Sequence, residues 1–161
     1  MSKYKEAHKY LFKAYNELSI TLGKDHVQTL QALTLLSRLA KDMGRFKDSL
    51  KYDNTLYNLS IKKFGDGDER VADAARQLAR THYLSGRYNQ AIGYYEQNLR
   101  IRKLLYGNEH PQVAVAINCV GMANKTIGNY DVAIKLCKEA YDIKIHLYGI
   151  NHSDTGTYVY F

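Results

Sequence analysis

The sequence contains no tryptophan, a single proline and only two cysteines among its 161 residues. Because proline is a strong helix breaker, its near absence favours an all-α fold. The cysteines, Cys119 and Cys137, are too few for a disulfide framework, and neither lies in a CxxC or histidine-rich context. These absences argue against a disulfide-rich secreted domain and favour a reducing compartment, so we expect a cytoplasmic protein.

Long hydrophobic runs are also missing. No apolar stretch reaches the about 18 residues that a membrane-spanning helix needs, and no apolar segment follows the N-terminus as a secretory signal would. We therefore expect no membrane partner. The composition, 45% hydrophobic and 24% charged, is typical of a globular chain. The net charge of +7 permits an acidic partner, but the basic residues are scattered along the sequence, which does not favour a nucleic-acid partner.

What the sequence does contain is a repeat. Seven of the eleven glycines recur at steps of 21 residues, and alternate members have different neighbours, so the full unit is 42 residues long. One set follows Leu, Phe or Tyr, and the other precedes Arg-aromatic or Asn-aromatic pairs. The glycines of this series are Gly23, Gly44, Gly65, Gly86, Gly107, Gly128 and Gly149.

The segments between these glycines have the pattern of helices. Apolar residues recur at helical spacing, as Leu30, Leu33 and Leu36 do. Each segment ends at a glycine, which adopts the left-handed conformation after a helix at no steric cost. The residues expected to cap or open the following helices are Asp25, Asn108, Asn151 and Pro111.

The glycine spacing predicts helices over residues 3–21, 27–43, 46–64, 69–85, 88–106, 111–127 and 130–148, with an eighth beginning after His152. They form a single domain with a half-unit at 1–22, units at 23–64, 65–106 and 107–148, and a partial unit at 149–161. Small residues recur where paired helices should approach closely. These residues are Ser37, Ala79 and Gly121 in the first helices and Ser49, Ala91 and Ala133 in the second helices.

This alternation resembles the tetratricopeptide repeat, in the 42-residue form found in kinesin light chains. The segments Leu22-Gly23-Lys24-Asp25-His26 and Tyr106-Gly107-Asn108-Glu109-His110-Pro111-Gln112-Val113-Ala114 follow the Leu-Gly-x-Asp/Glu-His-Pro-x-Val-Ala pattern of that family. Asn118 matches one of the asparagines that members carry in the first helix, whereas Thr34, Arg76 and Tyr160 occupy this phase in the other repeats. The resemblance implies an all-α, right-handed superhelical solenoid of seven to eight helices in antiparallel hairpins.

In this architecture the first helix of each unit lines the concave face. Arg76 and Arg80 lie one helical turn apart, so both guanidinium groups can share one carboxylate. We therefore predict a groove that binds an extended peptide or protein segment, with a preference for acidic groups. The alternative is a solvated basic face without a ligand. The predicted peptide-binding residues are Thr34, Arg38, Lys41, Arg76, Gln77, Arg80, Asn118, Met122 and Lys125.

No motif predicts catalysis, a metal or a cofactor. His26, His110 and His152 recur every 42 residues, one repeat apart, so they cannot share an ion and are expected to act structurally beside helix N-termini. The cysteines lack a histidine partner and are expected to be partly buried thiols. We therefore expect a non-enzymatic scaffold.

The two ends of the array suggest a second hypothesis. The chain matches a second helix at its start and a first helix at its end, and the segment 157–161 is not the polar cap that solenoid ends need. We expect a fragment of a longer array, or ends that another chain covers. The alternative function is thus a structural module that forms homo-oligomers through its uncapped ends.

Overall fold

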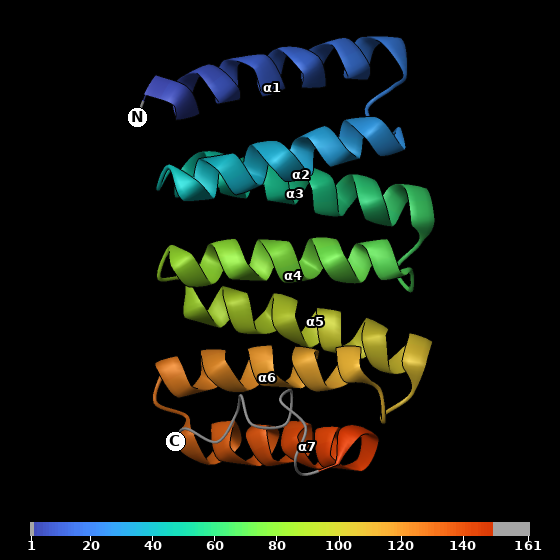
Figure 1. The fold of residues 1–161 in the computed structure, drawn as a ribbon, viewed down its shortest axis with the longest axis vertical. Coiled ribbons are helices and arrows are strands. Elements are labelled where there is room, and N and C mark those ends of the chain that lie inside the picture. Colours follow the sequence, from blue (N-terminus) through green and yellow to red (C-terminus); the bar gives the residue numbers. More distant parts are fainter. Residues whose placement is uncertain (1, 150–161) are drawn as a thin grey trace.

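The computed structural model describes residues 2–149, which form seven α-helices and no strand within that range (Figure 1). Every predicted helix is present, with bounds within one residue of the expected ones. The predicted eighth helix, the partial unit after Gly149, His152, Tyr160 and the segment 157–161 lie outside the described residues. The helices are α1 (Ser2–Thr21), α2 (Val27–Asp42), α3 (Phe46–Phe64), α4 (Glu69–Leu84), α5 (Tyr88–Tyr106), α6 (Pro111–Thr126) and α7 (Tyr130–Tyr148).

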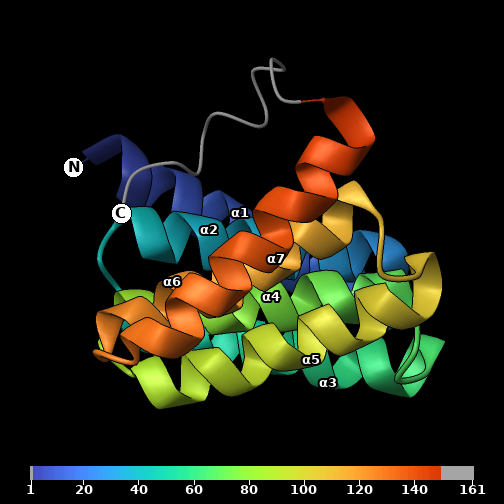
Figure 2. The same cartoon turned by 90° about the horizontal axis from the view of Figure 1, so that it is seen from below.

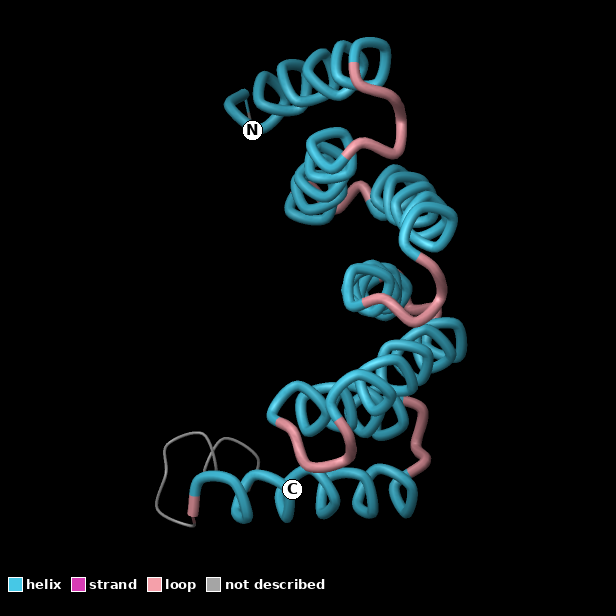
Figure 3. Tube along the Cα trace, turned by 90° about the vertical axis from the view of Figure 1, so that its right-hand side faces the viewer, coloured by secondary structure: helices cyan, strands magenta, loops and turns pink. Residues whose placement is uncertain are grey.

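The helices stack in sequence order, and each packs mainly on its neighbours along the chain (Figures 1 and 2). Seen from the side, the trace curves like a crescent, with α2 and α4 on the inner face and α3 and α5 on the outer face (Figure 3). The stack is therefore a helical solenoid with a concave and a convex side. Within residues 2–149, no helix combines the length and apolar character needed to cross a bilayer.

The glycines that end the helices adopt two different conformations. Gly44 has φ of 68°, and the backbone N–H groups of Gly44 and Arg45 donate to the carbonyls of Lys41 and Ala40, at 2.9 and 2.8 Å. This is a Schellman turn, as expected for a left-handed residue after a helix. Gly65 instead has φ of 84° and ψ of 158°, a region that is essentially restricted to glycine. The prediction of one left-handed turn type was therefore wrong for the turns between units.

The helix caps also differ from the prediction. The expected caps Asp25 and Asn108 do not act as such, because each lies one or two positions too early. His26 and His110 are the N-cap residues, and their Nδ1 atoms accept hydrogen bonds from the backbone N–H of the residue two positions later, at 3.3 and 3.2 Å. Asp68 caps α4 in the same phase of the repeat. The structural role predicted for the recurring histidines is thus confirmed at His26 and His110.

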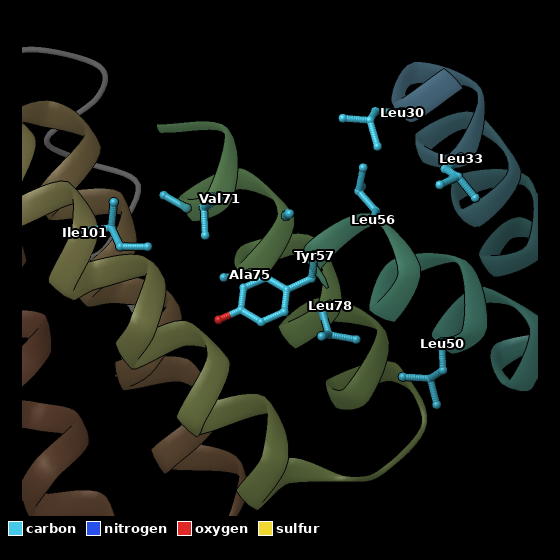
Figure 4. Packing of buried hydrophobic residues seen from close by; sticks show 11 residues of the cluster. Leu30, Leu33, Leu50, Leu56, Tyr57, Val71, Ala75, Leu78 and Ile101 are labelled. Atoms are coloured by element: carbon cyan, nitrogen blue, oxygen red, sulfur yellow. The ribbon is translucent and has the colours of Figure 1, made fainter. Parts of the chain in front are cut away.

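Between these turns, leucines and small residues form the core of the stack. Leu30 and Leu33 of α2 meet Leu50 and Leu56 of α3 and the buried face of α4, while Ile101 packs from α5 (Figure 4). Each fully buried aliphatic side chain contributes about 1.5–3 kcal/mol of stability. The predicted close approach of paired helices is confirmed. The Oγ atoms of Ser37 and Ser49 lie 3.0 Å apart, and a Cβ on Gly121 would lie 3.3 Å from the Sγ of Cys137.

Helix α1 differs from the other six helices in residues 2–149, because no residue of α1 with a described side chain is fully buried. Its half-buried Tyr15 packs against the core, and His8 Nε2 lies 3.2 Å from the hydroxyl of Tyr52 in α3. Contacts therefore tie α1 to α3 as well as to α2, but they bury little of α1.

Candidate functional site

Part of the predicted site lies in one hollow of the concave face, between α2 and α4. This hollow has a volume of about 470 Å³, and Asp42, Asp73 and Leu84 complete its lining. It brings together side chains from two successive units because the first helices of those units lie side by side on the inner face. The predicted residues that line it are Thr34, Arg38, Lys41, Arg76, Gln77 and Arg80.

A second, more apolar hollow adjoins the first. It has a volume of about 300 Å³ and reaches between α2 and α3, where Leu30, Leu56 and Phe64 contribute to its lining. Thr34 and Gln77 line both hollows. The concave face therefore places an apolar recess directly beside a recess rich in basic groups.

The three predicted residues on α6 do not line either hollow. Asn118 is turned toward α7, where its Oδ1 lies 3.8 Å from the Sγ of Cys137, which donates a weak hydrogen bond. Met122 is 50% exposed and occupies the phase that Arg38 and Arg80 hold in the preceding units. Lys125 is exposed near the end of α6. The structure thus places part of the predicted set together and separates Asn118, Met122 and Lys125 from it.

Lys41 belongs to a buried network and is not a free groove cation. Its Nζ donates to Ser37 Oγ at 2.8 Å and to Thr81 Oγ1 at 3.1 Å, and forms an ion pair with Asp53 Oδ2 at 3.3 Å. The Asp53 side chain is fully buried, and that of Lys41 is 10% exposed. Asp53 also accepts hydrogen bonds from Thr81 Oγ1 and, at 2.6 Å, from Gln77 Nε2. Both Lys41 and Gln77 are therefore held toward α3 by one carboxylate.

Burial lowers the pKa of Lys41 below its usual range, and the carboxylate of Asp53 opposes this shift. The nearby guanidinium of Arg80 lowers the pKa further, although by less. Because the ammonium depends on Asp53 for compensation, Lys41 offers little net charge to a ligand in the hollow.

A second ion-pair group lies at the other side of the basic hollow. Arg102 of α5 is almost completely buried, and its guanidinium donates to Asp73 Oδ1 at 2.6 Å and approaches Glu69 Oε1 at 3.5 Å. Arg76 lies 3.6 Å from the same Asp73 oxygen, with both of their side chains about half exposed. Asp73 is thus shared by two arginines, and Arg76 is partly neutralised.

Arg38 and Arg80 remain. Within residues 2–149, neither forms an ion pair or donates a hydrogen bond to another side chain, and both are exposed at the basic hollow. They occupy the same phase of successive units, 42 residues apart, so they face the concave side together. These two guanidinium groups are the cations in this hollow that are most available to an anionic ligand.

The thiols and histidines show no sign of chemistry. Burial raises the pKa of both Cys119 and Cys137, which disfavours the reactive thiolate. His82 stacks on Tyr94 with ring centroids 5.5 Å apart, and burial lowers its pKa. Among the described residues, no group of histidine, cysteine or acidic side chains is arranged to hold a metal ion.

Comparisons with known proteins agree with this geometry. A family model described as tetratricopeptide repeat matches residues 39–103 and 70–146. The solved structure of BtubC (BKLC) from P. vanneervenii has a TM-score of 0.80 at 20% identity, and the alignment covers 91% of this chain and 57% of that one. Two structures of Podosopora anserina kinesin light chain TPR-like repeats have TM-scores of 0.85 and 0.84 at 18% identity, covering 96% of this chain and 73% of theirs. No curated protein matches the sequence.

Proposed function

Since the chain belongs to the tetratricopeptide repeat family, whose repeats generally act as non-enzymatic scaffolds for protein interactions, we propose that it binds an extended peptide between α2 and α4. The chain spans about half the length of BtubC. The proposal concerns this segment of repeats and a cytoplasmic setting, with no cofactor.

The pair Arg38 and Arg80 is the observation that carries the proposal. Both guanidinium groups face one hollow without a carboxylate partner within the described residues, whereas Lys41 and Arg76 are compensated by Asp53 and Asp73. Planar guanidinium groups bind carboxylates through paired hydrogen bonds. An acidic side chain or a free C-terminal carboxylate therefore fits this position better than a neutral group.

The adjoining apolar hollow adds a second requirement. Leu30, Leu56 and Phe64 contribute to a recess of about 300 Å³ that opens next to the arginines. Filling it removes apolar surface from water, at about 25 cal/mol per Å². The ligand that fits both recesses carries one large apolar side chain with an acidic residue close to it in sequence.

The test is a binding measurement with fluorescein-labelled peptides that carry one leucine flanked by glutamates, compared with the same peptides carrying glutamines. We expect the acidic peptide to bind more tightly. The R38Q/R80Q variant should weaken its binding by about 10- to 100-fold, because charge-assisted hydrogen bonds are lost.

The matched control is R87Q/K135Q, which removes the same charge from positions outside the groove and should change the affinity little. R76Q should have a smaller effect than R80Q, because Arg76 already faces Asp73. Equal binding of acidic and glutamine peptides, or equal effects of the groove and control variants, would refute the acidic preference.

Self-association through the ends of the solenoid is a second candidate function. It is supported by apolar side chains exposed on the terminal helices, among them Tyr10 on α1 and Tyr130 on α7, which are 64% and 62% exposed. Burial of such side chains between copies would stabilise an oligomer. Analytical ultracentrifugation over a wide concentration range tests this candidate, and a monomer at all concentrations would exclude it.

A further inference from the structure

The positive charge of the protein is concentrated in its first half. Residues 1–64 contain twelve basic and six acidic side chains, a net charge of +6, whereas residues 65–161 contain eleven and ten, a net charge of +1. The groove accounts for only part of this excess, because Lys41 is paired with Asp53. A second basic surface must therefore lie elsewhere in the N-terminal half.

This surface lies on the convex side of α1 and α3. Its lysines are all exposed, and those of α3 lie on the helix face opposite to the buried residues Ser49, Asp53 and Ser60. The contact between His8 and Tyr52 places α1 and α3 side by side. We name this surface the convex lysine patch. It consists of Lys5, Lys9 and Lys13 of α1 and Lys47, Lys51 and Lys62 of α3.

The repeat provides an internal comparison for this patch. The same phases are held in α5 by Asn89, Gly93, Gln97 and Leu104, and in α7 by Asp131, Lys135, Glu139 and His146. A solvated outer helix face in this fold therefore does not need lysine. The enrichment in α1 and α3 is a property of this part of the surface and not of the repeat.

Few carboxylates compensate the patch. Of its six lysines, Lys13 alone lies within ion-pair distance of a carboxylate in the described residues, at 3.7 Å from Glu17. Asp48 of α3 is already paired with Arg45, at 2.6 Å. The patch thus presents a broad positive potential.

Apolar side chains interrupt this positive surface. Phe12 and Ile20 of α1 are 42% and 84% exposed. Their exposure is not a result of the missing neighbour of α1, because the same phases are exposed in α3, α5 and α7. Lysines combined with exposed apolar side chains on one helix face are typical of helices that lie on an anionic bilayer.

We propose that the convex lysine patch binds the surface of an anionic lipid bilayer, with Phe12 and Ile20 entering the headgroup region. Nucleic acid fits less well. The patch contains no arginine, which is the preferred residue for paired phosphate contacts, and an exposed isoleucine cannot stack on a base as aromatic residues do. The absence of a spanning helix, which led us to expect no membrane partner, does not bear on a peripheral contact.

Co-sedimentation with vesicles tests the proposal. The protein should bind vesicles of phosphatidylcholine with about one third phosphatidylserine, but not vesicles of phosphatidylcholine alone, and salt should weaken binding. The variant K5Q/K9Q/K47Q/K51Q should bind several hundredfold more weakly, at about fivefold per lysine. I20N should also weaken vesicle binding. Circular dichroism confirms that each variant is folded.

The control variant K24Q/R87Q/K135Q/K138Q removes the same charge from exposed positions outside the patch and should retain vesicle binding. Equal losses in the two fourfold variants would overturn the proposal, as would a lack of binding to phosphatidylserine vesicles. Binding to duplex DNA that depends on the patch lysines but not on Ile20, without vesicle binding, would identify the patch as a nucleic-acid surface instead.

Discussion

Removal of the buried carboxylate Asp53 should destabilise the protein more than any comparable change on its surface. Asp53→Ala leaves the Lys41 ammonium 10% exposed without a counter-charge, and it removes the acceptor of Gln77 and Thr81. Breaking a buried ion pair by removal of one partner costs about 3–5 kcal/mol. Since each kcal/mol corresponds to about 2–4 °C in a chain of this size, Tm should fall by about 6–20 °C.

The assay is urea unfolding followed by far-UV circular dichroism. Asp48→Ala is the matched control, because Asp48 lies on the same helix and its ion pair with Arg45 is 39–47% exposed. Its loss should cost at most about 1 kcal/mol. The double variant K41M/D53L replaces the ion pair with apolar side chains and should recover most of the stability lost in Asp53→Ala.

The pH dependence provides a further check. The folded pKa of Lys41 is already lowered, and loss of Asp53 should lower it more. Between the folded pKa and 10.5 the unfolded state then binds more protons, so the stability of Asp53→Ala should rise as pH approaches 10.5. If Asp53→Ala costs no more than Asp48→Ala, the network does not stabilise the stack and the reasoning fails.

Other predictions concern a tyrosine, a helix cap and a turn. Burial raises the pKa of Tyr95 to about 12, so the folded state keeps a proton that the unfolded state loses; stability should fall from pH 10 to 12, and Tyr95→Phe should flatten this part of the unfolding profile. The Arg70 guanidinium lowers the pKa of Asp68 to about 2, so its contribution is present above the unfolded value and lost as pH falls through 2; Asp68→Asn should keep the cap and reduce this acid sensitivity, whereas Asp68→Ala should cost about 1 kcal/mol at neutral pH. Gly65→Ala, at φ of 84°, should cost about 1–3 kcal/mol by urea unfolding, and a loss no larger than that of Gly67→Ala in the same turn would contradict the assigned strain.

The fold followed from the sequence because one signal, the glycine step of 21 residues, marks the end of every helix. That signal does not distinguish Gly44 from Gly65, whose ψ depends on the next residues and on how the units stack. It also could not show that His26 and not Asp25 caps α2, since both residue types accept a hydrogen bond and the two positions are adjacent.

The candidate site was less predictable because phase determines which face a residue occupies but not what it pairs with. Lys41 and Gln77 have groove phases, yet Asp53 holds both from the opposite helix. One signal for Asp53 was present: the other second helices place Leu11, Tyr95 and Cys137 in its phase. A carboxylate at a position of the repeat that is otherwise apolar or weakly polar indicates a buried partner of opposite charge.

Helix α1, which contains no fully buried residue among those with described side chains, has a consequence for the cooperativity of the array. In a linear stack each unit gains its stability from its neighbours, so the unit with the smallest interface opens most often. The amide hydrogens of α1 should therefore exchange with solvent well before those of α4, although both segments are helical. A partner that covers α1, such as a bilayer, would slow this exchange and add to the stability of the units behind it.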